Sequence, residues 1–138
     1  MSPEFAKEVA ACLSANGIKV YLFESLRPTP ELSFSVRRLG CIAGIVITAS
    51  HNPREYNGYK VYWEDGAQIT PPHDKNILGE VALVKDFEQM KTMPYEQAVS
   101  VGLIEIIGKE IDDEYIAQLK KQNMQVHMQE TRMPVLLL

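Results

Sequence analysis

The chain has 138 residues, of which 46% are hydrophobic and 23% are charged, and these proportions exclude wholesale disorder and collagen-like repeats. Its net charge of −4 offers no electrostatic reason to expect a nucleic acid partner. No apolar run reaches the roughly 20 residues that span a membrane, and the first residues lack the pattern of a signal peptide. We therefore expect one cytoplasmic domain that binds neither nucleic acid nor membrane.

The first part of the chain alternates helices and strands. A helix is predicted from Pro3, where the missing N–H costs nothing, to Gly17, which suits a helix C-cap. The pattern repeats from Pro30 to Gly40, and a strand-like segment follows each helix, at 18–23 and at 41–48. The second strand is almost continuously apolar, which is typical of a strand buried on both faces. This order predicts an α/β fold in three α/β/α layers around a mixed, mainly parallel sheet.

The rest of the chain is more varied. Residues 49–58 are polar and turn-forming, and Ala67–Ile69 is predicted to pair back on a strand at 59–63 through a turn at 64–66. The remaining predicted elements are a helix at about 74–84, an edge strand at 103–107 and a helix from a cap at Asp112 to about Lys121. No clear pattern marks 85–100 or the tail, so we expect a domain over 1–121 followed by an irregular segment over 122–138.

The polar segment after the buried strand is the candidate site. Ligands bind at the carboxyl ends of strands in open parallel sheets, and the strand at 41–48 runs directly into Ser50, His51 and Asn52. The three backbone amides are expected to form a concave array that suits an anion such as phosphate. Pro53 stiffens the exit from this loop by fixing its φ angle.

Three interpretations of this loop compete. The first is an ordinary polar loop. The second is a serine hydrolase, which the sequence favours little because the nucleophile elbow needs glycines where Thr48 and Asn52 stand. The third is phosphoryl transfer, with Ser50 carrying the phosphate.

The motifs TASHNP, YNGYKVY, EDGAQI and PP resemble the active-site serine segment of the α-D-phosphohexomutases, the family of phosphoglucomutases and phosphomannomutases. The stretch before them is similar to the first domain of that family. The resemblance covers about residues 1–85 well and 100–121 loosely. It implies an isomerase of the intramolecular phosphotransferase type, which interconverts hexose 1- and 6-phosphates through a hexose bisphosphate.

The resemblance also implies a role for individual residues. Ser50 is expected to carry the phosphate, and Mg²⁺ to bind an oxygen of that phosphoserine. His51 matches a position that orients the sugar hydroxyl or moves its proton, and Lys60 matches a lysine near the transferred phosphate. Asn52 and Arg54 are candidates for binding phosphate or substrate, with loop shaping by Asn52 and a solvated Arg54 as the alternatives.

Three segments that the resemblance leads one to expect are absent from the sequence: the Asp-Gly-Asp-x-Asp-Arg metal loop, a sugar-selecting loop and a phosphate clamp. The resemblance also implies a strand–helix–strand stretch before the first helix, which this sequence lacks. We therefore expect an incomplete first domain, truncated at its N-terminus and inactive alone, whose Mg²⁺ belongs to the full-length enzyme. The sugar stays open among glucose, mannose and pentose phosphates. The alternative is a non-catalytic α/β module that binds phosphate or protein, or forms a homodimer through an exposed sheet edge.

Overall fold

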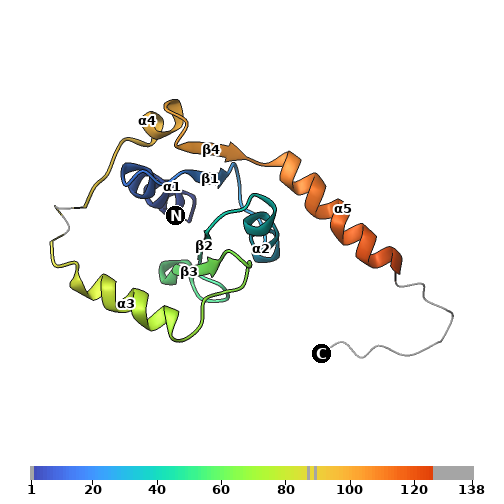
Figure 1. Cartoon of the computed structure of the whole chain (residues 1–138), viewed down its shortest axis with the longest axis horizontal. Coiled ribbons are helices and arrows are strands. Elements are labelled where there is room, and N and C mark those ends of the chain that lie inside the picture. The colour runs from blue at the N-terminus through green and yellow to red at the C-terminus, as the bar shows by residue number, and fades with distance from the viewer. Residues whose placement is uncertain (1, 87, 89, 126–138) are drawn as a thin grey trace.

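The computed structural model describes residues 2–86, 88 and 90–125, and its elements follow one another as Figure 1 shows. The helices are α1 (Ser2–Ala15), α2 (Thr29–Arg38), α3 (His73–Leu83), α4 (Tyr95–Ser100) and α5 (Lys109–Gln125), with a short 3₁₀ helix, η1, at Arg54–Tyr56. The strands are β1 (Val20–Phe23), β2 (Ala43–Thr48), β3 (Gly58–Trp63) and β4 (Ile104–Ile107). The predicted α/β class is confirmed.

Parallel and antiparallel strand pairs both occur. Strand β1 runs parallel to β4, with Val20 opposite Ile104, and β2 runs antiparallel to β3, with Thr48 opposite Gly58. The strand that lies parallel to β1 is therefore β4 and not β2. The prediction that residues 41–48 form a strand buried on both faces is wrong, because Gly44 is the buried residue of β2 and its other residues are half-buried.

The core gathers around α1 and the β1–β4 pair. Ala10 of α1, Ala98 of α4 and Ile104 of β4 are buried together, and partly buried side chains from β1 and from the segment before α4 pack on them. Helix α2 packs on β2 and α5. The segment without a predicted structure, 85–100, thus contributes a helix to the core.

The ends of the last helix differ from the prediction. Helix α5 begins at Lys109 rather than after a cap at Asp112, and it continues past Lys121 to Gln125. The Asp112 carboxylate accepts two hydrogen bonds from Arg27, at 2.6 and 2.7 Å, instead of capping the helix. The predicted boundary at 121 falls inside α5, and residues 126–138 of the predicted tail lie outside the described residues.

The predicted hairpin after β3 is confirmed. Tyr62 bridges to Gln68, and the Trp63 N–H donates to the Ala67 carbonyl at 2.9 Å. Gly66 turns the chain with a φ of +76°, a region that glycine adopts without a steric penalty. The Arg37 guanidinium donates to the Asp65 carbonyl at 3.1 Å, which ties this turn to α2.

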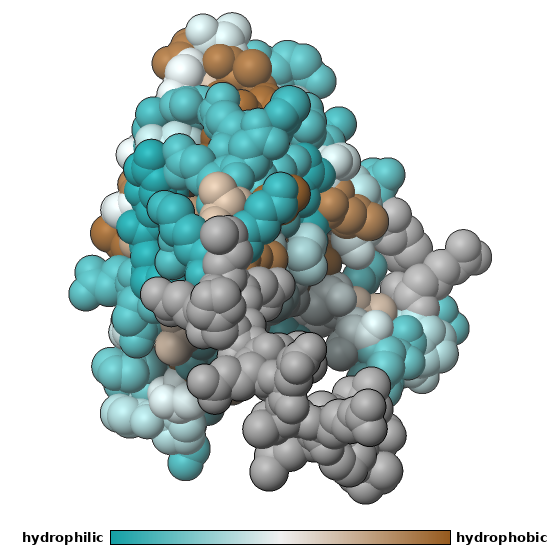
Figure 2. Space-filling model, turned by 90° about the vertical axis from the view of Figure 1, so that its right-hand side faces the viewer, coloured by the Kyte–Doolittle hydropathy of each residue, from teal (hydrophilic) through white to brown (hydrophobic). Residues whose placement is uncertain are grey.

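Helix α3 has no buried residue, and Figure 1 shows it set apart from the helices that cover the strands. Its Leu78, Val81 and Leu83 are at least 60% exposed. Figure 2 shows another face of the molecule, where hydrophilic residues predominate around separate apolar groups. Within the described part of the chain, no helix is both long enough and apolar enough to cross a membrane.

Candidate functional site

Ser50 lies two residues beyond the end of β2, in a loop that returns to the sheet as β3. The base of the loop is closed by the pairing of Thr48 with Gly58. An added Cβ at Gly58 would lie 3.2 Å from the Thr48 carbonyl oxygen, so glycine suits the close approach of the two strands. The Ser50 side chain is exposed. The fold thus presents a serine hydroxyl to solvent at the carboxyl end of a strand, where α/β domains bind ligands.

The backbone of Ser50 is in the left-handed region, with a φ of +56°, and no other non-glycine residue in the described part of the chain has a positive φ. This region costs a residue with a Cβ about 1–3 kcal/mol and persists where the surroundings enforce it. The Ser50 N–H donates to the Thr48 hydroxyl at 2.9 Å, and the Asn52 N–H donates to the Ala49 carbonyl at 3.0 Å. These two bonds fold the loop tightly around Ser50.

The predicted array of three free amides is wrong. Because the Ser50 and Asn52 amides already donate within the loop, two of the three predicted donors have partners there. Binding of an anion at this loop therefore depends more on hydrogen bonds from side chains, and less on backbone amides, than the sequence indicated.

His51 lies beside the serine hydroxyl. Its Nδ1 is 3.4 Å from the Ser50 Oγ, a long contact in which the tautomer decides which atom donates. Both side chains are exposed. A small movement shortens this contact to a hydrogen bond, and catalytic contacts often tighten when substrate binds. The imidazole is thus within reach of the proton on Ser50.

Lys60 stands on β3 opposite Val46 and is half-buried. Opposite residues of an antiparallel pair share a face, so Lys60 lies on the same face as Thr48 and diagonal to it. Diagonal neighbours are about 7–8 Å apart, a distance that a lysine side chain spans. Lys60 therefore lies on the same sheet face as Thr48, the residue whose hydroxyl accepts a hydrogen bond from the Ser50 amide.

The other two predicted site residues lie along the loop. Asn52 is exposed, and Arg54 is the first residue of η1, four positions beyond Ser50. Pro53 precedes η1, and the Tyr56 N–H donates to its carbonyl at 2.9 Å. Both candidates thus lie on the same loop as Ser50, Asn52 before Pro53 and Arg54 at the start of the 3₁₀ helix.

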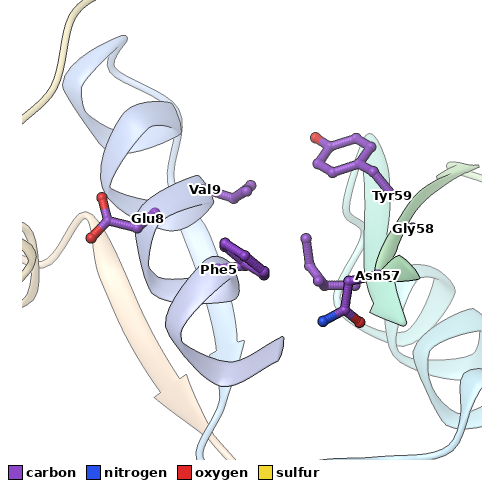
Figure 3. Close-up of a pocket in the computed structure, with 7 residues that line it drawn as sticks. Phe5, Glu8, Val9, Asn57, Gly58 and Tyr59 are labelled. Atoms are coloured by element: carbon purple, nitrogen blue, oxygen red, sulfur yellow. The ribbon is translucent and has the colours of Figure 1, made fainter. Parts of the chain in front are cut away.

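A hollow of about 320 Å³ beside the end of this loop was not predicted from the sequence. In Figure 3, Phe5 and Val9 project from α1 toward Tyr59 and Asn57 on the β3 side. Burial, together with Cys12, raises the pKa of Tyr59. The Ser2 hydroxyl lies 3.0 Å from the Asn57 amide oxygen, a hydrogen bond that holds α1 against the loop. Phe5 and Val9 are four residues apart in the sequence, a spacing that puts them on one face of α1, but nothing there indicated that this face would meet β3.

Among the described residues, no three His, Cys, Asp or Glu side chains gather closely enough to hold a metal ion. These residues alone therefore do not fit a Mg²⁺ site.

Together these observations define an α/β domain that offers a serine hydroxyl, with an imidazole beside it, at the end of a strand. The family described as "Phosphoglucomutase/phosphomannomutase, alpha/beta/alpha domain I" matches residues 1–86. The chain belongs to this family, and the resemblance seen in TASHNP and its neighbouring motifs is confirmed.

Relatives with known names agree with this assignment. The chain is 43% identical over 126 residues to a human phosphopentomutase, a match that covers 87% of this chain and 19% of the relative. It is 58% identical over 77 residues to a mouse glucose 1,6-bisphosphate synthase, covering 56% of this chain and 12% of the relative. It is 59% identical over 70 residues to a phosphoglucomutase of Staphylococcus epidermidis, covering 51% and 13%. The chain thus spans less than a fifth of the length of these relatives.

Proposed function

We propose that this chain carries the phosphoserine of a phosphohexomutase, with Ser50 as the residue that gives phosphate to a hexose monophosphate and takes it back from the bisphosphate. The family and its relatives, which are named as phosphomutases and a sugar bisphosphate synthase, support this reaction type. The observation that carries the proposal is the exposed Ser50 hydroxyl, held at a positive φ with His51 Nδ1 at 3.4 Å.

In the proposed transfer, a sugar hydroxyl oxygen attacks the phosphorus of phosphoserine, and the bond between phosphorus and Ser50 Oγ breaks. The sugar hydroxyl loses its proton as the new bond forms, and Ser50 Oγ gains one as the old bond breaks, so no proton is consumed overall. His51, whose Nδ1 lies 3.4 Å from Oγ, is the nearby group that would deliver the proton to Oγ and be recharged by the proton from the sugar hydroxyl. The return step reverses these changes at the other phosphate of the bisphosphate. The phosphate would be stabilised during transfer by the positive charges of Lys60 and Arg54 and by the side-chain amide of Asn52.

Enzymes of this family generally depend on Mg²⁺. In the proposal, an oxygen of the Ser50 phosphate is the ligand that this chain supplies, and the ion would neutralise negative charge on the phosphate. The described residues do not form a metal site by themselves. In the transfer itself, Ser50 forms and breaks the bond to phosphorus, and His51 moves the proton.

We expect phosphate uptake to be confined to Ser50. The purified chain is incubated with glucose 1,6-bisphosphate, and intact mass followed by peptide mapping is expected to find an increment of about 80 Da, the mass of a phosphate ester, on the peptide that holds Ser50. Ser50→Ala should remain unmodified, whereas Ser100→Ala, which alters another exposed serine, should behave like the unaltered chain. Phosphate on a different serine, or none on Ser50, would contradict the proposal.

We also propose that the chain alone does not complete the mutase cycle. Its serine loop supplies the nucleophile for a single slow transfer of phosphate onto Ser50, but repeated turnover between the two sugar phosphates depends on many positioned groups acting together. The chain also spans at most 19% of the length of the relatives compared above. Conversion of glucose 1-phosphate to glucose 6-phosphate by the purified chain, lost in Ser50→Ala, would overturn this expectation.

A second candidate function is an interaction module that forms a homodimer through its sheet edges. Within the described residues, β1 and β2 each pair with one other strand, and both line a cavity of about 670 Å³ together with α1 and α2. Unpaired strand edges are templates for pairing with another chain. These open edges favour the candidate.

Sedimentation velocity tests the dimer across micromolar concentrations. We expect a concentration-dependent dimer that Ile45→Lys abolishes, because the new charge lies in the cavity between the open strands. Ile116→Lys on α5, where the original side chain is already 47% exposed, is the matched control and should still dimerise. A monomer at every concentration would rule out the homodimer.

A further inference from the structure

We propose that Thr48 is a positioning residue, whose hydroxyl holds Ser50 in the left-handed conformation that brings the serine hydroxyl to His51. This inference rests on the role proposed for Ser50, and it extends that role to a residue that does not itself touch the phosphate. It starts from two observations, the φ of +56° at Ser50 and the hydrogen bond of 2.9 Å from the Ser50 N–H to Thr48 Oγ1.

The hydroxyl of Thr48 is itself well fixed. Thr48 is the last residue of β2, is half-buried and pairs with Gly58, so its backbone belongs to the sheet rather than to the loop. A β-branched side chain is also stiff about its first torsion, which limits where the hydroxyl can lie. The acceptor for the Ser50 amide is therefore anchored to the strand pair.

Ser50 needs such an anchor. Glycine and, less often, asparagine adopt a positive φ readily, whereas serine carries a Cβ that makes this region unfavourable. A side-chain oxygen that accepts the N–H of the residue two positions later stabilises a local turn of this kind. With this hydrogen bond, a serine, which supplies a hydroxyl, can occupy a position whose backbone conformation would otherwise favour glycine.

The position of the hydroxyl depends on that conformation. In the left-handed backbone, the Ser50 Oγ lies 3.4 Å from His51 Nδ1. If the amide of Ser50 loses its acceptor, the bond from the Asn52 N–H to the Ala49 carbonyl remains across the loop. We expect this bond alone to be insufficient, so that Ser50 relaxes toward a negative φ and its side chain turns to a different direction. Loss of the Thr48 hydroxyl should therefore separate the serine from the imidazole even though both residues are intact.

The experiment compares Thr48→Val, which keeps the shape but removes the acceptor, with Thr48→Ser, which restores it. The readouts by NMR are the intraresidue amide–Hα NOE of Ser50, which is strong at positive φ, and the hydrogen-exchange rate of its amide. In Thr48→Val we expect the strong NOE to vanish and exchange to become about fivefold faster, as for the loss of a typical hydrogen bond. Thr48→Ser should match the unaltered chain. Thr92→Val, which changes an exposed threonine outside the loop, is the matched control.

The proposal is overturned if Ser50 keeps its strong NOE and slow exchange in Thr48→Val. It is also overturned if the unaltered chain lacks the strong NOE, a test that stands even where Thr48→Val does not fold.

Phosphate uptake by Ser50 from glucose 1,6-bisphosphate is then measured on the same proteins, and we expect Thr48→Val to lose it and Thr48→Ser to retain it. Equal uptake by Thr48→Val and the unaltered chain contradicts the positioning role. No uptake by any of them contradicts the proposed function instead and leaves the NMR result to decide on Thr48.

Discussion

Alanine in place of Gly66 is expected to lower the free energy of unfolding by about 2–4 kcal/mol, because it combines a strained backbone with a steric clash. Gly66 has a φ of +76°, and an added Cβ would lie 2.6 Å from the backbone carbonyl oxygen of Ser33 on α2. A backbone atom cannot move aside as the end of a long side chain can. The same Cβ would also meet the Arg37 guanidinium, so the turn after β3 would lose its contact with α2.

Substitutions at two other glycines separate the contribution of backbone strain from that of the steric clash. Gly102 has a φ of +77° but no atom within 4 Å of an added Cβ, so Gly102→Ala measures backbone strain alone and should cost about 1–2 kcal/mol. Gly79 has neither feature and lies in α3, so Gly79→Ala should cause no loss of stability. Urea unfolding followed by circular dichroism gives all three values. If Gly66→Ala cost no more than Gly102→Ala, the contact with Ser33 would not constrain the turn.

The sequence allowed us to predict the helices and strands that carry local signals, but not which strands pair with one another. The helices and strands up to Trp63 follow from caps, glycines and apolar runs that lie within each element. Helix α4 was missed because it has six residues and a single buried side chain, Ala98, too few to show a helical period. The pairing of β1 with β4 joins Val20 to Ile104, far along the chain, and a local pattern carries no information about so distant a partner.

The candidate site shows the same division. Ser50 stood out because a recognisable motif follows an apolar strand, and the structure puts it at the end of β2. Its positive φ could not be predicted, since serine rarely adopts it, and Thr48 drew attention only as a residue that a hydrolase would not have. The expected amide array was wrong because the short loop forms hydrogen bonds within itself. The hollow between Phe5 and Tyr59 depends on how α1 meets β3, which the sequence alone did not reveal.

The buried carboxyl group of Glu31 is expected to have the second large effect on the free energy of unfolding, and this effect depends on pH. Glu31 of α2 is 4% exposed, and its Oε1 has no hydrogen-bond partner among the described residues. Desolvation, followed by the neighbouring Asp112, raises the pKa of Glu31 above its usual 4.5. Arg27 holds the pKa of Asp112 low, so Asp112 keeps its negative charge beside Glu31. The folded state therefore favours a protonated Glu31.

The sign of the pH dependence follows from that shift. A carboxyl whose pKa is raised in the folded state binds more protons there than in the unfolded chain, so its contribution to stability is present below about pH 4.5 and is lost as the pH rises through the folded pKa. Glu31→Gln, which cannot ionise, should therefore be more stable than the unaltered chain at pH 7, by about 1 kcal/mol, and the difference should shrink toward pH 4.

Thermal unfolding of both proteins between pH 4 and pH 8 measures this difference, with Glu64→Gln as the control because Glu64 is exposed. The control should follow the unaltered chain at every pH. If Glu31→Gln were instead less stable at pH 7, Glu31 would act as a charged partner of Arg27, and the attraction of that ion pair would outweigh the cost of burying the carboxylate. Since Arg27 already donates two hydrogen bonds to Asp112, at 2.6 and 2.7 Å, we expect the burial cost to dominate.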